Sequence, residues 1–116
     1  RWKVSSVPGE NAVLEEGMLT SDEPGFYAEG KYGIRTENLL LCRKSEKTEY
    51  GQFMEFEPVT LVPIDTTAVI PEMMREKEIQ WLNEYHERVY QTIGPQLLEK
   101  EREWLRKATL PLKKEV

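Results

Sequence analysis

Two glutamates have the clearest potential for chemistry in this sequence. Glu23 and Glu37 lie on either side of Gly30, in a stretch where β-favouring runs are separated by proline and glycine. A hairpin folded symmetrically about Gly30 pairs residues that are equally far from it, and this would place Glu23 directly opposite Glu37. Like charges in such a position destabilise a sheet. The pair therefore needs a proton, a cation or abundant water.

Facing carboxylates can serve as ligands of divalent cations. Hard oxygen atoms on opposite strands can bind or bridge such ions, and two metal ions about 3.5 to 4 Å apart can clamp and activate a water molecule. The spacing by itself favours the plainer interpretation of Glu23 and Glu37 as two solvated acids on a hairpin. The chain also offers too few other ligands to complete a metal site alone.

Two neighbouring side chains could support the glutamates. Arg35 precedes Glu37 by two residues, so both share one face of a strand, and its guanidinium could orient the carboxylate or a substrate. A plain surface ion pair is the alternative for Arg35. Tyr27 lies near the start of the turn, where its hydroxyl could support the site or its ring could simply pack.

The remaining reactive residue types favour structural roles. His86 is the only histidine, and its position within a helical pattern indicates packing rather than metal binding. Cys42 ends an apolar run and reads as a small buried hydrophobe. Trp81 and Trp104 are expected to be interface or core anchors. A single histidine allows no Ser/His/Asp or Cys/His catalytic arrangement.

The elements that position these residues begin with β-structure. We expect a hairpin over residues 17–42 and a solvent-exposed loop over residues 43–51. Because proline cannot donate to a ladder, Pro58 and Pro63 should mark a bulge or an edge position. Further short strands are expected over residues 2–7, 52–57 and 60–64.

The second part of the chain has helical periodicity. Apolar residues recur at steps of three and four from about Glu72, which predicts an amphipathic helix of about six turns. Gly94 fits the end of this helix and Pro95 the first turn of a second helix, which should run to about Ala108. The fold class is therefore α+β, a strongly twisted antiparallel sheet with two C-terminal helices. We expect a β-rich region over residues 1–70 and a helical region over residues 71–116.

Composition limits the partners and the compartment. The chain has 116 residues and a net charge of −5, which argues against non-specific binding to nucleic acid or anionic membranes. One cysteine cannot form an internal disulfide, so we expect a reducing, cytoplasmic location. The sequence opens on Arg1 without an initiator methionine, and we expect that it begins inside a longer protein.

Several segments resemble one metallopeptidase family. Residues 23–27 (EPGFY) and 30–40 (GKYGIRTENLL) resemble the last part of the pita-bread catalytic domain of Xaa-Pro aminopeptidases (aminopeptidase P). Residues 56–65 (FEPVTLVPID) resemble the strands that follow. Residues 81–86 (WLNEYH) and 104–105 resemble the helical C-terminal extension of the large, three-domain cytosolic type. Thr36 departs from the family pattern, where an apolar residue is common.

The resemblance implies a dinuclear metal site. In that family two aspartates, one histidine and two glutamates hold two divalent ions, commonly manganese, with zinc or cobalt as alternatives. Glu23 matches a ligand of one metal and Glu37 the carboxylate that bridges both. The resemblance further implies that Glu23 helps to take a proton from the water that attacks the substrate carbonyl. Arg35 and Tyr27 match supporting positions.

The implied activity is removal of the N-terminal residue from peptides with proline in second position. No segment resembles the aspartate and histidine motifs, so the metal site should be incomplete in this chain, which should be inactive alone. The parent enzyme is expected to be a homodimer, and the chain to self-associate. The alternative is a non-catalytic pita-bread module that binds peptides or proteins, although such a module has no need of facing carboxylates.

Overall fold

The computed structural model describes Gly9 and residues 13–115, so the strand expected over residues 2–7 lies outside the described residues. The chain divides into two compact units, Arg1–Thr60 and Leu61–Val116. The described part of the first unit consists of strands, and the second unit is helical. The functional division expected after residue 70 stays a prediction.

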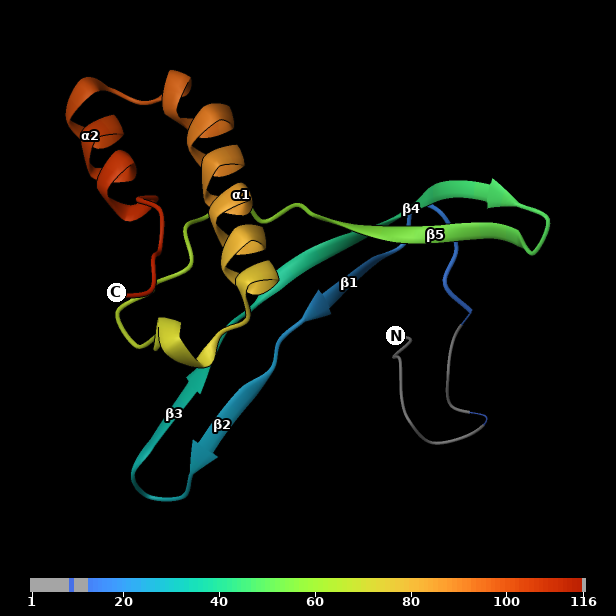
Figure 1. Cartoon of the computed structure of the whole chain (residues 1–116), viewed down its shortest axis with the longest axis horizontal. Helices are drawn as coiled ribbons and strands as arrows, with labels where there is room; N and C mark the ends of the chain where they lie inside the picture. Colours follow the sequence, from blue (N-terminus) through green and yellow to red (C-terminus); the bar gives the residue numbers. More distant parts are fainter. Residues whose placement is uncertain (1–8, 10–12, 116) are drawn as a thin grey trace. The chain divides into compact units, whose positions relative to one another are not determined.

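The described residues of the first unit form five strands in two antiparallel sheets (Figure 1). A three-stranded sheet has the order β1–β4–β5, and β2 and β3 form a two-stranded ribbon. The strands are β1 (Leu19–Asp22), β2 (Gly25–Ala28), β3 (Tyr32–Arg35), β4 (Asn38–Thr48) and β5 (Gly51–Pro58). The expected hairpin over residues 17–42 is therefore present, but each of its arms consists of two strands with a short break between them. At its tip Gly30 adopts a positive φ of 66°, which glycine tolerates without strain.

The expectation of a loop over residues 43–51 is wrong. β4 continues to Thr48 and pairs with β5, with a register shift between Lys44 and Lys47. Arg43 stands opposite Glu55 and also forms an ion pair with Glu57. Because most side chains in this part of the hairpin are exposed, the sequence shows no apolar alternation there, and main-chain pairing forms the strands.

The strand expected over residues 60–64 is also absent from the described structure. Pro63 has no N–H group to donate to a ladder. The neighbouring backbone groups are instead bonded to α1 (Glu76–Ile93), where the Tyr85 hydroxyl donates to the Val62 carbonyl at 2.6 Å. The Ile64 N–H donates to Nε2 of His86 at 3.0 Å. Side chains of α1 thus form the hydrogen bonds of two backbone groups in residues 60–64, although the composition of this segment favours a strand.

The first long helix begins later than predicted. The first predicted turn of helix is a separate 3₁₀ turn, so α1 has 18 residues, or about five turns. Gly94 caps α1 with a right-handed φ of −50°, so it ends the helix without the left-handed conformation usual for such glycines. The elements are η1 (Pro71–Met73), α1 (Glu76–Ile93), η2 (Gly94–Gln96) and α2 (Glu99–Ala108).

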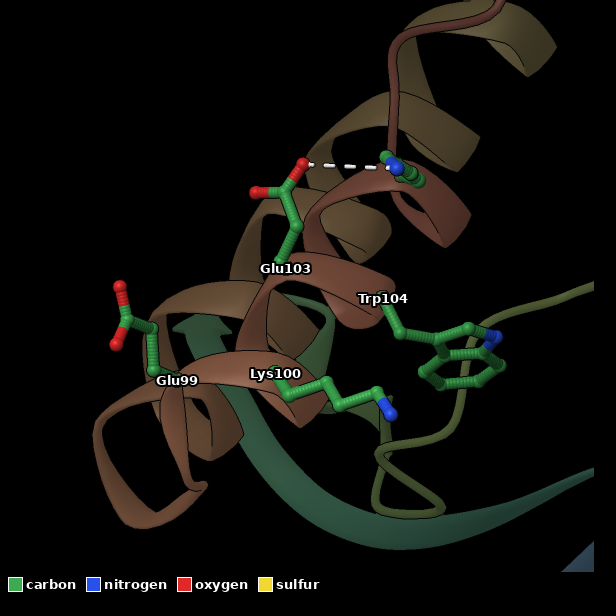
Figure 2. Close-up of a pocket in the computed structure, with 5 residues that line it drawn as sticks. Glu99, Lys100, Glu103 and Trp104 are labelled. Atoms are coloured by element: carbon green, nitrogen blue, oxygen red, sulfur yellow. Dashed lines mark ion pairs between the residues drawn. The ribbon is translucent and has the colours of Figure 1, made fainter.

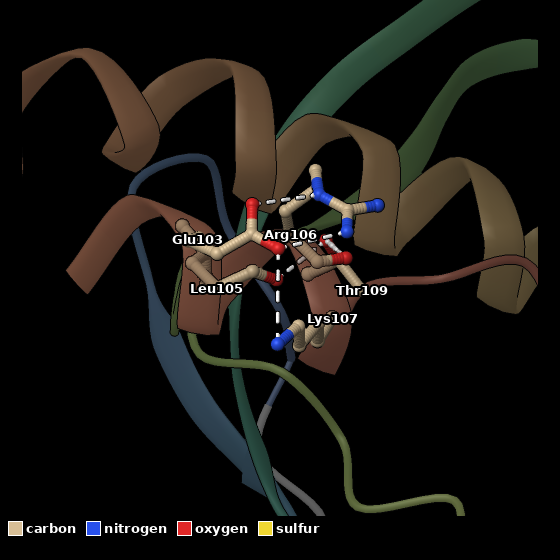
Figure 3. Close-up of polar contacts among 5 residues, drawn as sticks. All are labelled: Glu103, Leu105, Arg106, Lys107 and Thr109. Atoms are coloured by element: carbon tan, nitrogen blue, oxygen red, sulfur yellow. Dashed lines mark hydrogen bonds and ion pairs between the residues drawn. The ribbon is translucent and has the colours of Figure 1, made fainter. Parts of the chain in front are cut away.

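An apolar core holds the two helices together. Leu82, Tyr85 and Val89 from α1 pack with Leu105 from α2. At the end of α2 the Thr109 hydroxyl donates to the Leu105 carbonyl at 2.8 Å (Figure 3). The predicted end of the second helix at Ala108 is confirmed.

Three of the predicted packing residues can be assigned. Cys42 is 1% exposed, which confirms its prediction as a small buried hydrophobe. Trp81 and Trp104 are at least half exposed, so neither is a core anchor of this chain. Trp81 instead stacks on the ring of Tyr85, with 5.7 Å between the ring centroids. Within the described residues, no helix combines the length and the apolar character needed to cross a membrane.

Candidate metal centre

Glu23 and Glu37 occupy the break between the two sheets of the first unit. Every paired residue from β1 to the start of β4 lies as far from Gly30 as its partner does, so the predicted register is confirmed. The pairs that flank the glutamates are Asp22–Asn38 on one side and Gly25–Arg35 on the other. Between them the Thr36 N–H donates to the Pro24 carbonyl at 3.1 Å. The strands therefore run past each other without a slip, and the two glutamates face each other.

The register places all four predicted site residues on one face, two of them in the β2–β3 ribbon and two in the break beside it. The alternation of side chains along a strand places Glu23 and Tyr27 on the same face as Arg35 and Glu37. The Arg35 Nε lies 3.5 Å from Glu37 Oε2, so the predicted proximity of these two groups is confirmed. Their side chains are 52% and 42% exposed, which leaves the ion pair open to solvent. Such an exposed pair adds little stability.

The Tyr27 ring covers two glycines on this face. A Cβ atom added to Gly33 would lie 2.6 Å from Cδ1 of Tyr27, and one added to Gly25 would lie 2.6 Å from its hydroxyl oxygen. Both distances are far inside van der Waals contact, so glycine at these positions makes room for the ring. The sequence indicated the glycines only as strand breakers and did not reveal this contact.

The opposite face of the ribbon is apolar. Phe26 stands opposite Ile34 in the register, and Tyr32 lies two residues before Ile34 on the same strand. The Phe26 and Tyr32 rings lie 6.0 Å apart, and all three side chains are at least half exposed. The ribbon thus has an apolar face and an opposite face that carries Tyr27 and Arg35.

Asn38 is a buried residue whose role the sequence did not indicate. It follows Glu37 directly, is only 8% exposed and is hydrogen-bonded to the backbone of Thr60. Its one sequence signal is a polar residue immediately before the apolar run Leu39–Cys42. This signal was too weak to separate a buried amide from a solvated one.

The two glutamates fit part of a divalent metal site. Their carboxylates supply the hard oxygen atoms that such ions prefer. Within the described residues, no three His, Cys, Asp or Glu side chains lie close enough together to hold a metal ion. Glu23 and Glu37 therefore need further ligands to complete a site.

His86 has a structural role, as predicted. It is 1% exposed, and its Nε2 accepts the Ile64 N–H while its Nδ1 has no hydrogen-bond partner. Burial lowers the pKa of the His86 imidazole, because the charged form loses its hydration. The neutral ring is thus used to hold the backbone at Ile64.

A concave region lies on α2, away from the two glutamates in the sequence. A cavity of about 500 Å³ is lined by Glu99, Lys100, Glu103, Trp104 and Lys107. Figure 2 shows Lys100 and Trp104 extending from the same side of the helix, whereas Glu99 and Glu103 point elsewhere. Glu103 is already paired with Arg106 and Lys107. These side chains form no cluster suited to a metal ion.

Two family models match the chain. Residues 2–44 match metallopeptidase family M24, and residues 52–112 match the C-terminal region of peptidase M24. Together these matches cover both the strand-rich and the helical unit.

Individual relatives agree with the family models. The chain is 37% identical over 107 residues to a probable Xaa-Pro aminopeptidase P of Coprinopsis cinerea, covering 88% of this chain and 17% of that protein. It is 37% identical over 116 residues to Xaa-Pro aminopeptidase 2 of Homo sapiens, covering 96% of this chain and 17% of that protein. The chain therefore spans about one sixth of the length of these relatives.

A solved structure matches the fold. The X-prolyl aminopeptidase of Caenorhabditis elegans, described as a cytosolic enzyme with a di-nuclear active site, superimposes with a TM-score of 0.80 at 36% sequence identity. The match covers 93% of this chain and 18% of that enzyme.

Proposed function

Because the chain belongs to metallopeptidase family M24, we propose that Glu23 and Glu37 are ligands of a dinuclear metal site in an Xaa-Pro aminopeptidase. The resemblance to this enzyme family and the α+β, partial pita-bread fold are both confirmed by the matches. The individual site residues and the activity of the whole protein are the subject of the proposal.

The observation that carries the proposal is the confirmed register around Gly30. It sets two acids opposite each other at a point where like charges are unfavourable without a cation. Arg35 lies against one of them, Glu37, and so adds a single positive charge to a site with two negative ones. A divalent ion between the carboxylates would compensate the remaining charge. The alternative, that both acids are only solvated, gives no reason for two like charges to lie directly opposite each other.

Each residue has a distinct task in this proposal. Glu23 and Glu37 would together hold the metal ions, with Glu37 as the ligand that both ions share, and the Glu23 carboxylate would also accept a proton from water. Arg35 restricts the orientation of the Glu37 carboxylate through its ion pair. The Tyr27 ring, fixed over Gly25 and Gly33, presents its hydroxyl on the same face. When bound, the metal ions supply Lewis-acid polarisation of the substrate carbonyl and lower the pKa of water.

The proposal extends to the whole protein. The remaining ligands, two aspartates and a histidine, would come from sequence outside these 116 residues, and manganese is the proposed metal. The substrate is a peptide with proline in second position, from which the first residue is removed. We place the protein in the cytoplasm, since the Caenorhabditis elegans relative is described as cytosolic and one cysteine suits a reducing compartment. A homodimer is the proposed assembly of the whole protein.

A chimeric enzyme tests this function. In the chimera, the chain replaces the matching segment of the Caenorhabditis elegans aminopeptidase, with which it shares 36% of residues. We expect the chimera to cleave an Xaa-Pro peptide in the presence of Mn²⁺, and the chain alone to be inactive. Glu37→Ala should abolish the activity of the chimera.

The matched control is Glu29→Ala, which removes an exposed acid from the turn of the same ribbon. It should leave cleavage unchanged. A folded chimera that retains full activity after Glu37→Ala would refute the proposal. Chelator-sensitive cleavage by the chain alone would refute the expectation that its metal site is incomplete.

A further inference from the structure

We propose that Asn38 is a positioning residue for Glu37, through a clamp that its buried side-chain amide forms with Thr60. The inference rests on the proposed function of Glu37 as a metal ligand. Asn38 touches neither the substrate nor the metal in this proposal, because it acts on the backbone that carries Glu37.

Both halves of the Asn38 amide contact one residue. Its Oδ1 accepts the Thr60 N–H at 3.1 Å, and its Nδ2 lies 3.4 Å from the Thr60 carbonyl oxygen. The side chain is 8% exposed, so these bonds are made largely out of water. A buried amide that lost them would leave polar groups unsatisfied, which is costly. The side chain is therefore fixed in one orientation.

A second set of bonds joins the same two segments. The Leu39 N–H donates to Oγ1 of Thr60 at 3.0 Å, and the Val59 N–H donates to the Leu39 carbonyl at 2.9 Å. The β4–β5 ladder ends at Pro58, which has no N–H group to donate. Residues 59–60 therefore stay beside the start of β4 through one backbone bond, from Val59 to Leu39, and through the side-chain bonds of Asn38 and Thr60.

This arrangement matters because Glu37 itself lies outside both ladders. On one side it is held by the bond from the Thr36 N–H to the Pro24 carbonyl. On the other side it is covalently joined to Asn38, which pairs with Asp22 on β1 and is clamped by Thr60. Mutation of a residue that orients a metal ligand without touching the metal commonly lowers metal affinity by about tenfold or more. The clamp fixes the backbone from which the Glu37 carboxylate projects.

The test uses the 116-residue chain and the variant Asn38→Ala. In the wild-type chain the Glu37 amide should be rigid on the nanosecond timescale, with an NMR order parameter of about 0.85. In the variant it should fall toward about 0.6, while β1–β4 amides such as Leu41 stay protected from hydrogen exchange. This readout needs no metal ion.

A second readout uses Mn²⁺ alone as the probe. Paramagnetic broadening of the amides of Glu23 and Glu37 should require at least about tenfold more Mn²⁺ in Asn38→Ala than in the wild type. Thr60→Val, which removes the acceptor for the Leu39 N–H, should act in the same direction. Thr60→Ser keeps that acceptor and should restore the wild-type values.

The outcomes separate the two proposals. An unchanged Glu37 order parameter in Asn38→Ala, with the fold intact, would overturn the clamp. Failure of Thr60→Ser to differ from Thr60→Val would also contradict it. If the order parameter falls as expected but Mn²⁺ broadens neither glutamate in the wild-type chain, the clamp stands, and the metal role of Glu37 is decided by the chimera, in which the remaining ligands are present.

Discussion

The strand register about Gly30 determines where Glu23 and Glu37 lie relative to each other. Their types and distances from Gly30 were enough to predict that they face each other, and the pairs on both sides confirm this. The position of Arg35 also followed from the two-residue period of a strand. Asn38 could not be predicted, because its burial depends on Thr60, which lies 22 residues away in the sequence.

The first prediction concerns the glycines beneath Tyr27. The ring should shift the Hα resonances of Gly25 and Gly33 upfield, because it lies against both residues. Gly33→Ala would place a methyl group 2.6 Å from Cδ1 of Tyr27 and should displace the ring. The Gly25 resonance should then return to its unshifted position in the NMR spectrum, as it should in the control Tyr27→Leu. A Gly25 resonance that stays shifted in Gly33→Ala would contradict the packing.

The second prediction concerns pH. Burial keeps the pKa of His86 below its ordinary value of about 6.5, and a protonated Nε2 would meet the Ile64 N–H donor. Between pH 6.5 and the lowered folded-state pKa, the unfolded chain binds a proton that the folded chain does not. The stability due to neutral His86 is therefore complete above about pH 6.5 and is lost as the pH falls.

Denaturant unfolding at several pH values between 5 and 8 measures this effect. The control is His86→Gln, which retains an acceptor for the Ile64 N–H but does not titrate. The wild type should lose stability more steeply than His86→Gln below about pH 6.5. Parallel curves for the two proteins would show that His86 does not contribute.

Among the helices and strands, the sequence pattern predicted those elements that depend on neighbouring residues in the sequence. The apolar stripe of α1 and the end of α2 at Ala108 were predictable, because both follow from periodicity and turn residues. The exposed end of the β4–β5 hairpin was not, since partner strands form it by main-chain pairing without an apolar face. The prediction of a strand over residues 60–64 was wrong for the opposite reason. These residues have β-favouring side chains, but their backbone groups are hydrogen-bonded to side chains of α1.

The third prediction tests the packing of α2 on α1. Leu105 is 2% exposed and belongs to the core shared by the two helices. Leu105→Ala should lower the free energy of unfolding of the helical unit by about 2 to 5 kcal/mol. Leu98→Ala, at a position that is 74% exposed, should change it by less than about 0.5 kcal/mol. Equal effects in denaturant titrations followed by circular dichroism would contradict the assignment of the core.

Among the residues that the structure describes, buried apolar side chains are unevenly distributed. The core cluster and its partly buried neighbours all lie within Leu61–Val116. In the described part of the other unit, Cys42 is the buried apolar residue, and the apolar face of the β2–β3 ribbon is exposed. The expected self-association of the chain remains a prediction, for which this exposed face is the natural surface.

The fourth prediction follows from this distribution. Hydrogen exchange of the 116-residue chain should be slowest in α1, because its amides open only when the shared core unfolds. The β2–β3 ribbon should exchange fastest among the strands, since it is a two-stranded sheet with both faces largely exposed. Mass spectrometry of exchanged peptides measures both. Ribbon protection equal to that of α1 would contradict the uneven distribution of stability.

The most direct test of the central claim is the metal content of the chimeric aminopeptidase that carries this chain. After loading with Mn²⁺ and removal of free metal, elemental analysis should find two ions per chain in the parent chimera and in Glu29→Ala, in agreement with a dinuclear site. Glu37→Ala should lose most of this metal, because the carboxylate that bridges both ions is gone, and Glu23→Ala should bind less than the parent. Two tightly bound ions in a folded Glu23→Ala/Glu37→Ala double variant would contradict the claim that these facing carboxylates hold the metals.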